Sequence, residues 1–347
     1  MLGGGIYVTQ NKKLPGSYIN IITTARVTSG IGERGTVAIA LPIGKEVGKV
    51  FELTASDFVQ NCETILGVKY GDKSMLALRE IFVHSNKVYL YDLGANGAKT
   101  ISDAMAALEP YDFNVICVYG ESTEDASACI TQVKAWRDDQ GKKCQAVVYN
   151  ATTPNHEGVV NVVSTVSNED VPEYALVAWV AGAQAGCPVN ESCTNALYDG
   201  ELTIVADKTQ SQLEACLDAG QFAFHNVYGQ IRVLEDINSL TEFTADKGED
   251  FKYNQTIRVV DQIANDIAKL FNTKYLGKIP NNASGRVTLW GDIVKHHQEL
   301  ERINAIENFD PTLVTVEQGD SKKAVVVNDV ITVTNCMAQL YMTIVVQ

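Results

Sequence analysis

The chain has 347 residues, of which 46% are hydrophobic and 20% are charged, a composition typical of globular proteins with buried cores. It carries 42 acidic against 28 basic residues, so its net charge is −14. This balance argues against a surface built mainly to bind phosphate or nucleic acid. The length allows two or three domains of ~100–200 residues each.

The eight cysteines do not form any CxxC pair, and no Cys/His group has zinc-finger spacing. The N-terminus lacks the basic and apolar regions of a signal peptide, and no apolar run reaches the ~18 residues of a membrane span. We therefore expect reduced thiols in a protein that is made and folded in the cytosol, without a membrane anchor.

Residues 1–28 are predicted to form an extended arm. Three glycines near the start and Pro15 break regular structure, and the run Tyr18–Thr23 is rich in β-branched residues that favour an extended backbone.

Residues 29–90 alternate turn residues with short β-like runs at Thr36–Leu41 and Lys87–Tyr91, and one helical pattern lies near 75–83. This pattern predicts a small β-rich domain.

Residues 91–240 change in character. Buried-strand runs such as Phe113–Tyr119 and Gln145–Tyr149 alternate with helical patterns near 121–140 and 172–185. Alternation of strands and helices predicts an α/β domain with an at least partly parallel sheet.

Residues 241–347 begin with two helical patterns, near 252–271 and 288–306. Short β-like runs follow, and the last of them, about 338–347, has no glycine or proline after it. We predict an α+β domain that ends in a strand-forming arm.

Two glycine-rich segments resemble nucleotide-binding motifs but lack the required context. Gly30–Gly35 spells GxGxxG, yet a strand pattern follows it where dinucleotide binding needs a helix. Gly67–Ser74 has three residues instead of four between its glycines, and Asp72 would repel phosphate. We interpret the first as a turn between β segments and the second as a loop that caps the following helix, and we expect no cofactor.

The segment Lys295–Arg302 gathers His296, His297, Glu299 and Glu301 on one helix, without a third metal ligand at suitable spacing. A solvated or interface-facing helix surface is the preferred interpretation. The sequence also lacks the GxSxG pattern of serine hydrolases. We therefore predict no catalytic residues and no metal site.

Three segments, taken in order, resemble the tail sheath proteins of contractile phages, defective prophages and R-type bacteriocins. They are Leu14–Asn20, Arg34–Leu41 and Arg232–Leu240, which contains the stretch Asp-Ile-Asn-Ser-Leu. The similarity extends over essentially the whole chain and looks closest to the short sheaths of Gram-positive defective prophages.

This resemblance implies a small β domain, a central domain of subtilisin-like α/β topology without a catalytic triad, and a C-terminal α+β domain that faces a tail tube. It implies a structural subunit that stacks in hexameric rings and contracts to drive the tube through a target envelope. The expected partners are further copies of the chain, the tube protein, and baseplate and tail terminator proteins. The expected location is a phage or phage-tail-like particle assembled in the host cytoplasm.

In this family the terminal arms add strands to the sheets of neighbouring subunits, which is β-augmentation. The residues expected to pair in this way are Tyr18, Ile19, Asn20, Ile21 and Ile22 at one end, and Leu340, Tyr341, Met342, Thr343, Ile344 and Val345 at the other. The helix that carries Lys295 and Arg302 is a candidate for facing the tube.

Two alternatives stay open from the residues alone. One is an α/β hydrolase with β appendages, which would need a nucleophile and a base in one cleft. The other is a small-molecule binding protein that uses the Gly30–Gly35 turn.

Overall fold

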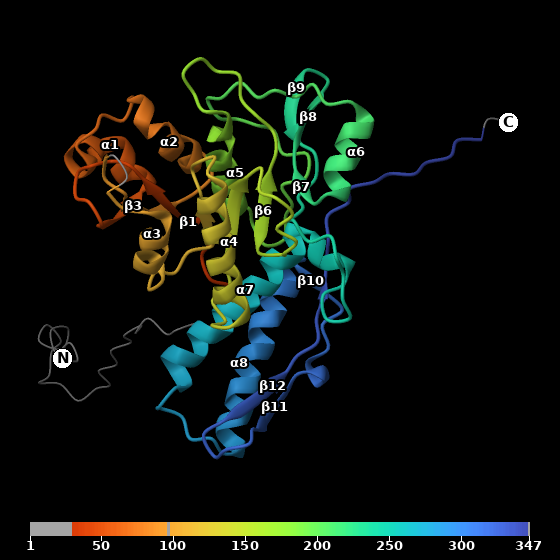
Figure 1. Ribbon diagram of the computed structural model, residues 1–347. Coiled ribbons are helices and arrows are strands. Elements are labelled where there is room, and N and C mark those ends of the chain that lie inside the picture. The colour runs from red at the N-terminus through yellow and green to blue at the C-terminus, as the bar shows by residue number, and fades with distance from the viewer. Residues whose placement is uncertain (1–29, 96–97, 346–347) are drawn as a thin grey trace, which may run out of the picture.

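The computed structural model describes residues 30–95 and 98–345 (Figure 1). Its largest feature is one seven-stranded sheet in the order β2-β3-β1-β4-β5-β6-β7. All neighbouring pairs are parallel except β2 with β3. The strands are β1 Thr36–Leu41, β2 Val50–Thr54, β3 Lys87–Asp92, β4 Val115–Cys117, β5 Gln145–Tyr149, β6 Val159–Val162 and β7 Gln221–Phe222.

Helices cover both faces of this sheet, so the strands are buried on both sides as expected for a parallel sheet. In β1, Val37 and Ile39 pack into a core with α1, α2 and α5, whereas Ala38 packs into a second core with α3 and α4. The helices are α1 Ala55–Leu66, α2 Leu76–Phe82, α3 Ile101–Leu108, α4 Thr123–Asp138 and α5 Leu176–Gly186. A sixth helix, α6 Gln210–Asp218, lies beside β7.

Local sequence signals explain where several helices begin. Thr100 and Asp103 form a reciprocal capping box at the start of α3, and Thr209 and Gln212 form another at α6. Asp72 accepts a hydrogen bond from the Ser74 backbone N–H and caps the short 3₁₀ helix that precedes α2. The predicted role of this glycine-flanked loop as a helix cap is therefore confirmed.

The prediction of a separate β-rich domain at residues 29–90 is wrong. β1 and β3 form the centre of the seven-stranded sheet together with β4. The missed element is α1, which runs from its Thr54 N-cap to Gly67 in the left-handed conformation and covers one face of the sheet. The continuous apolar character of Thr36–Leu41 is that of a strand buried on both faces, which belongs inside an α/β sheet.

The C-terminal region contains two long helices and two small sheets. Its helices are α7 Asn254–Leu270, which continues as a π-helical turn over Phe271–Tyr275, and α8 Ala283–Arg302. Its strands are β10 Ile306–Glu307, β11 Thr315–Gln318, β12 Val325–Asn328 and β13 Thr332–Val333. β10 pairs with β13, and β11 pairs with β12, both antiparallel. A further hairpin in the preceding region pairs β8 Phe224–Val227 with β9 Gln230–Val233.

The last described residues, 334–345, contain no helix or strand, and Figure 1 shows them leading away from the body of the molecule. The expected strand over about 338–347 therefore has no partner within the described chain, and its pairing stays a prediction. The expected arm over 1–28 lies outside the described residues. None of the described helices combines the length and apolar character needed to cross a bilayer.

Candidate functional site

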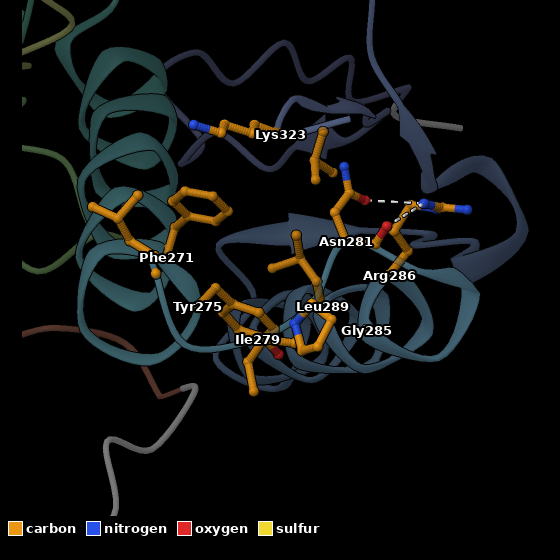
Figure 2. A pocket seen from close by; sticks show the side chains of 12 residues that line it. Phe271, Tyr275, Ile279, Asn281, Gly285, Arg286, Leu289 and Lys323 are labelled. Atoms are coloured by element: carbon orange, nitrogen blue, oxygen red, sulfur yellow. Dashed lines mark hydrogen bonds between the residues drawn. The ribbon is translucent and has the colours of Figure 1, made fainter. Parts of the chain in front are cut away.

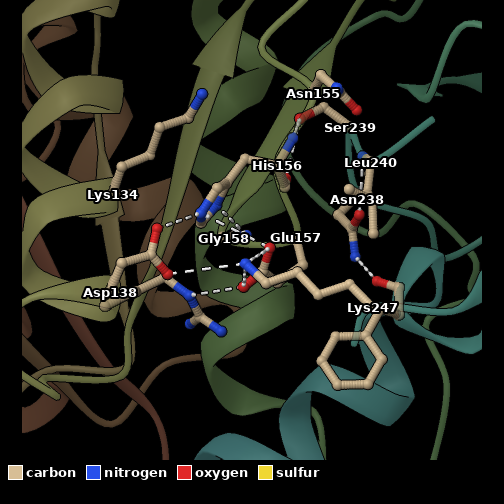
Figure 3. Close-up of polar contacts among 12 residues, drawn as sticks. Lys134, Asp138, Asn155, His156, Glu157, Gly158, Asn238, Ser239, Leu240 and Lys247 are labelled. Atoms are coloured by element: carbon tan, nitrogen blue, oxygen red, sulfur yellow. Dashed lines mark hydrogen bonds and ion pairs between the residues drawn. The ribbon is translucent and has the colours of Figure 1, made fainter. Parts of the chain in front are cut away.

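A cluster of titratable side chains at the end of α4 has the composition of an active site or a metal site (Figure 3). In the described ranges, Asp138, His156 and Glu157 are the one group of three that could hold a metal ion. His156 Nε2 lies 3.3 Å from Asp138 Oδ2 and 3.6 Å from Glu157 Oε2. Ser239 lies nearby, so the residue types of a Ser-His-Asp triad are also present.

The hydrogen bonds of Ser239 are not those of a nucleophile. Its Oγ donates to the backbone carbonyl of His156 at 3.0 Å and accepts from the His156 backbone N–H at 3.2 Å. A triad needs the serine hydroxyl to donate to the imidazole, which takes its proton. This serine instead fixes the backbone between β5 and β6.

The tautomer of His156 argues against a metal on its Nε2 atom. His156 Nδ1 accepts a hydrogen bond from the Gly158 backbone N–H at 2.9 Å, so the neutral ring carries its proton on Nε2. A metal at Nε2 would require that proton to move to Nδ1, where it would face the Gly158 N–H. Burial also holds the pKa of His156 below its usual value, which favours the neutral ring.

Two basic side chains occupy the position that a cation would take. Lys247 Nζ lies 2.9 Å from Glu157 Oε1 and 3.7 Å from Asp138 Oδ1, and Arg137 Nε lies 3.8 Å from Glu157 Oε1. Burial alone would raise the pKa of Glu157, but His156, Lys247 and Arg137 together lower it. The cluster is therefore an ion-pair network that joins α4, the turn before β6 and the segment 239–247.

The Gly30–Gly35 segment leads directly into β1, so the strand expected after it is present, whereas the β segment expected before it lies outside the described residues. The Gly32 backbone N–H donates to Asp266 Oδ2 on α7 at 3.0 Å, so it binds a side chain of the same chain. Gly35 has a φ of 102°, which favours glycine, and the Asn114 side chain accepts from its N–H at 3.0 Å. The segment anchors the start of the sheet to α7.

An apolar hollow of about 100 Å³ lies at the far end of the C-terminal region (Figure 2). Phe271, Tyr275 and Leu289 contribute apolar walls, and Asn281 Oδ1 accepts from Arg286 Nη1 at 2.9 Å at one side. It is smaller than the ~300–1,000 Å³ typical of small-molecule sites. It contains no pair of a nucleophile and a base.

The interpretation of the His296–His297 segment as a solvated surface is wrong. Both rings are buried, and each faces a carboxylate: His296 Nε2 lies 2.9 Å from Asp266 Oδ2, and His297 Nε2 lies 2.7 Å from Asp329 Oδ2. The first contact ties α8 to α7. The second ties α8 to the segment between β12 and β13.

The neighbouring residues Lys295 and Arg302 lie on the opposite, exposed face of α8. They are seven residues apart and so share that face. Arg302 is paired with Glu299 at 2.8 Å, and its side chain is 70% exposed. A role in contacting a tube stays a prediction.

The joint between the sheet and the C-terminal helices is built from buried charges that the sequence did not reveal. Arg258 on α7 lies 3.1 Å from Asp236, and both side chains are 1% exposed. Burial would raise the pKa of Asp236, but Arg258, Gln184, Cys193 and Asn254 together hold it below its usual value. A second buried pair, which is bidentate, joins Arg137 on α4 to Asp261 on α7.

The stretch Asp236–Leu240, which carried part of the resemblance, lies at this joint and all five residues are buried. The Asn238 side chain donates to the Phe251 carbonyl at 2.7 Å, and the Ser239 N–H donates to the Val159 carbonyl at 2.8 Å. These contacts fix the crossing from the sheet to α7. The signal in the sequence was a run of short polar residues around two apolar ones.

The predicted C-terminal pairing residues are solvent-exposed in the isolated chain. The base of the tail is held by Gln255 on α7, which donates to the Thr334 carbonyl at 3.1 Å and accepts from the Cys336 N–H at 3.0 Å. Beyond it, Leu340 is 86% exposed and Ile344 is 73% exposed. The other exposed apolar residues there are Met337, Tyr341, Met342 and Val345. The N-terminal set, residues 18–22, lies outside the described residues.

The β11–β12 hairpin offers unpaired strand edges. It forms a separate two-stranded sheet whose partners are only each other among the described strands. Val326 and Val327 on β12 are exposed. A two-stranded sheet of this kind is marginal alone and gains stability from further strands.

Comparisons with known proteins agree with these features. A family model described as phage tail sheath protein central domain matches residues 94–239, and one described as phage tail sheath C-terminal domain matches residues 246–347. A tail sheath protein of Clostridium phage phiCD119 is 26% identical over 296 residues, covering 84% of this chain and 82% of its own length.

Solved structures show the same fold. The crystal structure of a sheath tail protein from Desulfitobacterium hafniense superimposes with a TM-score of 0.76 at 27% identity, covering 92% of this chain and 100% of that one. The sheath of the anti-feeding prophage in its contracted state gives a TM-score of 0.73 at 14% identity, covering 96% and 99%. The chain therefore belongs to the phage tail sheath proteins, a family of structural subunits of contractile tails rather than of enzymes.

Proposed function

We propose that this chain polymerises in stacked hexameric rings around a tail tube and contracts to drive the tube through a target cell envelope. The observation that carries the proposal is the C-terminal tail. It is anchored at its base to α7, yet it presents six exposed apolar residues between Met337 and Val345. Monomeric proteins rarely expose such a run, because it lowers their solubility.

The proposed acceptor of this tail is the β11–β12 hairpin of a neighbouring copy. Added strands would complete its main-chain hydrogen bonds, and the exposed Val326 and Val327 would gain apolar contacts. We propose the same mode of pairing for Tyr18–Ile22 at the other end of the chain. Because each subunit both gives and receives strands, pairing of this kind extends into a lattice.

Contraction in this proposal is a shift from a metastable extended lattice to a better-packed one, without a nucleotide. Two helical sheaths among the structural neighbours were solved in their contracted states, which supports the same kind of change here. The arms would keep the subunits joined while the folded bodies move. Baseplate and tail terminator proteins would cap the two ends of the stack.

The tube contact is proposed for the exposed face of α8 that carries Lys295 and Arg302. On a chain with a net charge of −14, two basic residues on one helix face offer a local contact for an acidic partner. The particle would be a phage tail or a phage-tail-like device, assembled in the host cytoplasm.

We also propose a subtilisin-like topology for the central domain, supported by a mostly parallel sheet with helices on both faces. The alternative of an active hydrolase finds no support at Ser239, because its hydroxyl is bonded to the backbone of His156 and not to the ring.

Negative-stain electron microscopy tests the proposal. The full chain should form rings, tubes or sheath-like cylinders, whereas a chain that lacks 338–347 should give single particles with unchanged circular dichroism. A full chain that stays monomeric under all conditions, or a truncated chain that still forms normal cylinders, would contradict it.

A further inference from the structure

Two cysteines lie together where α5 ends, in the loop 187–193. The backbone N–H of Cys187 donates to the Ala183 carbonyl at 2.9 Å. Cys193 Sγ also donates to the Ala183 carbonyl at 3.7 Å, and Cys187 Sγ donates to the Glu191 carbonyl at 3.6 Å. The loop thus folds back on itself, and the Cys193 thiol shares the Ala183 carbonyl with the Cys187 backbone N–H.

Two arginines, one of them paired with Asp236, lie close to the two cysteines. Arg258 Nη1 donates to the Glu191 carbonyl at 2.8 Å, and Arg258 Nη2 lies 4.0 Å from Cys193 Sγ. Arg34 Nη2 donates to the Gln184 carbonyl at 3.4 Å. Within the described chain, the buried Nε atoms of both arginines have no hydrogen-bond partner.

The two thiols differ in accessibility and in acidity. Cys187 is half-buried, whereas Cys193 is buried. The neighbouring Cys193 thiol lowers the pKa of Cys187, and Arg258 and Arg34 lower it further against the effects of burial and of Asp236. The neighbouring Cys187 thiol, burial and Asp236 raise the pKa of Cys193. A thiolate with positive neighbours and an accessible surface is the reactive form of cysteine.

We propose that Cys187 and Cys193 form a redox-active dithiol that closes to an intrachain disulfide when the protein meets a small-molecule disulfide. The Cys187 thiolate attacks one sulfur of that disulfide, forms a mixed disulfide and releases one small thiolate. Cys193 then loses its proton and attacks the Cys187 sulfur, releasing the second small thiolate. The two protein thiols lose two electrons and two protons, and the small disulfide gains them as two thiols.

The oxidised loop would stiffen the joint at Arg258, because the same loop supplies the Glu191 carbonyl and the Cys193 N–H to the Arg258–Asp236 pair. This proposal does not depend on how the subunits assemble. The loop 187–193 would then be a site of oxidation in addition to its structural role.

Peptide mapping with a protease that cleaves after glutamate tests it. The full chain is treated with oxidised glutathione at neutral pH, and the remaining free thiols are then alkylated. Cleavage after Glu173, Glu191 and Glu201 separates Cys187 from Cys193 on two peptides that contain no other cysteine. We expect these peptides to stay joined until a reductant is added, and to appear separately alkylated without oxidation.

Variants separate the roles of the two residues. In Cys193→Ala, Cys187 should remain as a mixed disulfide with glutathione, and in Cys187→Ser neither peptide should react. The matched control is Cys336→Ser, because the Cys336 thiol contacts the same loop at the Asn190 carbonyl and is more exposed. It should leave the joined peptides unchanged. Peptides that remain separate after oxidation, or faster modification of Cys336 than of Cys187, would overturn the proposal.

Discussion

The strands in the two halves of the molecule are paired and buried in different ways. In the α/β half, helices on both faces bury the sheet, and the strand β1 is flanked by strands on both sides. In the C-terminal half, β11 and β12 pair only with each other among the described strands, and a run of apolar residues near the chain end is exposed. The first half buries its sheet within the single chain, whereas in our proposal neighbouring copies complete the second.

The largest expected effect on stability lies at the joint between these halves. Arg258→Met would leave Asp236 charged, buried and without its cationic partner. Loss of one member of a buried pair costs about 3–5 kcal/mol. Urea unfolding of the unassembled protein should show this loss. The control Arg302→Met removes an exposed pair and should change stability by less than about 0.5 kcal/mol. If the two substitutions lowered the stability equally, the buried Arg258–Asp236 pair would not have the proposed importance.

The next effect concerns packing inside the α/β half. A Cβ atom at Gly182 on α5 would collide with the backbone carbonyl of Ile81 on α2. Gly182→Ala should therefore destabilise the protein by about 1–3 kcal/mol in thermal or urea unfolding. The control is Gly291→Ala on α8, where a Cβ meets nothing within 4 Å. It should stabilise by ~0.5–1 kcal/mol. If Gly291→Ala were less stable than Gly182→Ala, this result would contradict the close contact between α2 and α5.

An effect of similar size depends on pH. The pKa of Glu157 is lower in the folded protein than in the unfolded chain, because His156, Lys247 and Arg137 outweigh the effect of burial. Its contribution to stability is therefore present above the unfolded pKa of ~4.3 and is lost as the pH falls through the lower folded value. Glu157→Gln should cost roughly 1–3 kcal/mol at pH 7, and the difference from the natural protein should shrink in acid. A difference that grows as the pH falls would contradict the ion-pair assignment.

The smallest effect on stability should accompany a complete loss of assembly. The double variant Leu340→Lys and Ile344→Lys changes side chains that are exposed in the isolated chain, so unfolding should shift by less than about 0.5 kcal/mol. Cylinders should be absent in electron micrographs. The control Tyr228→Asn changes a fully exposed aromatic residue on the β8–β9 hairpin and should leave cylinders intact. If the double variant forms normal cylinders, the C-terminal tail is not needed for assembly and the proposal is wrong.

The sequence predicted many helices and strands well, but the prediction of which strands share a sheet was partly wrong. Apolar periodicity predicted the seven-residue α2, the helices α4 and α7 and most strands of the sheet. It did not predict that β1 and β3 join the same sheet as β4, because strand order depends on contacts between distant segments.

The buried charges were missed for a related reason. On α7, Val260 is half-buried while Arg258 and Asp261 are buried, which is the reverse of what an apolar stripe predicts. Partners more than twenty residues away neutralise these charges, and no local pattern contains them. The same applies to His296 and His297, whose carboxylate partners lie on other elements.

Hydrogen exchange measured by mass spectrometry on unassembled and assembled protein tests the central claim most directly. If the tail of one copy pairs with the β11–β12 hairpin of another, the backbone amides of 340–345, and those of 325–328 that do not face β11, should exchange rapidly in the unassembled chain. Both sets should become strongly protected together on assembly. Amides of β1 should be protected in both states. Assembled cylinders in which residues 340–345 exchange as fast as in the unassembled chain would contradict strand exchange between subunits.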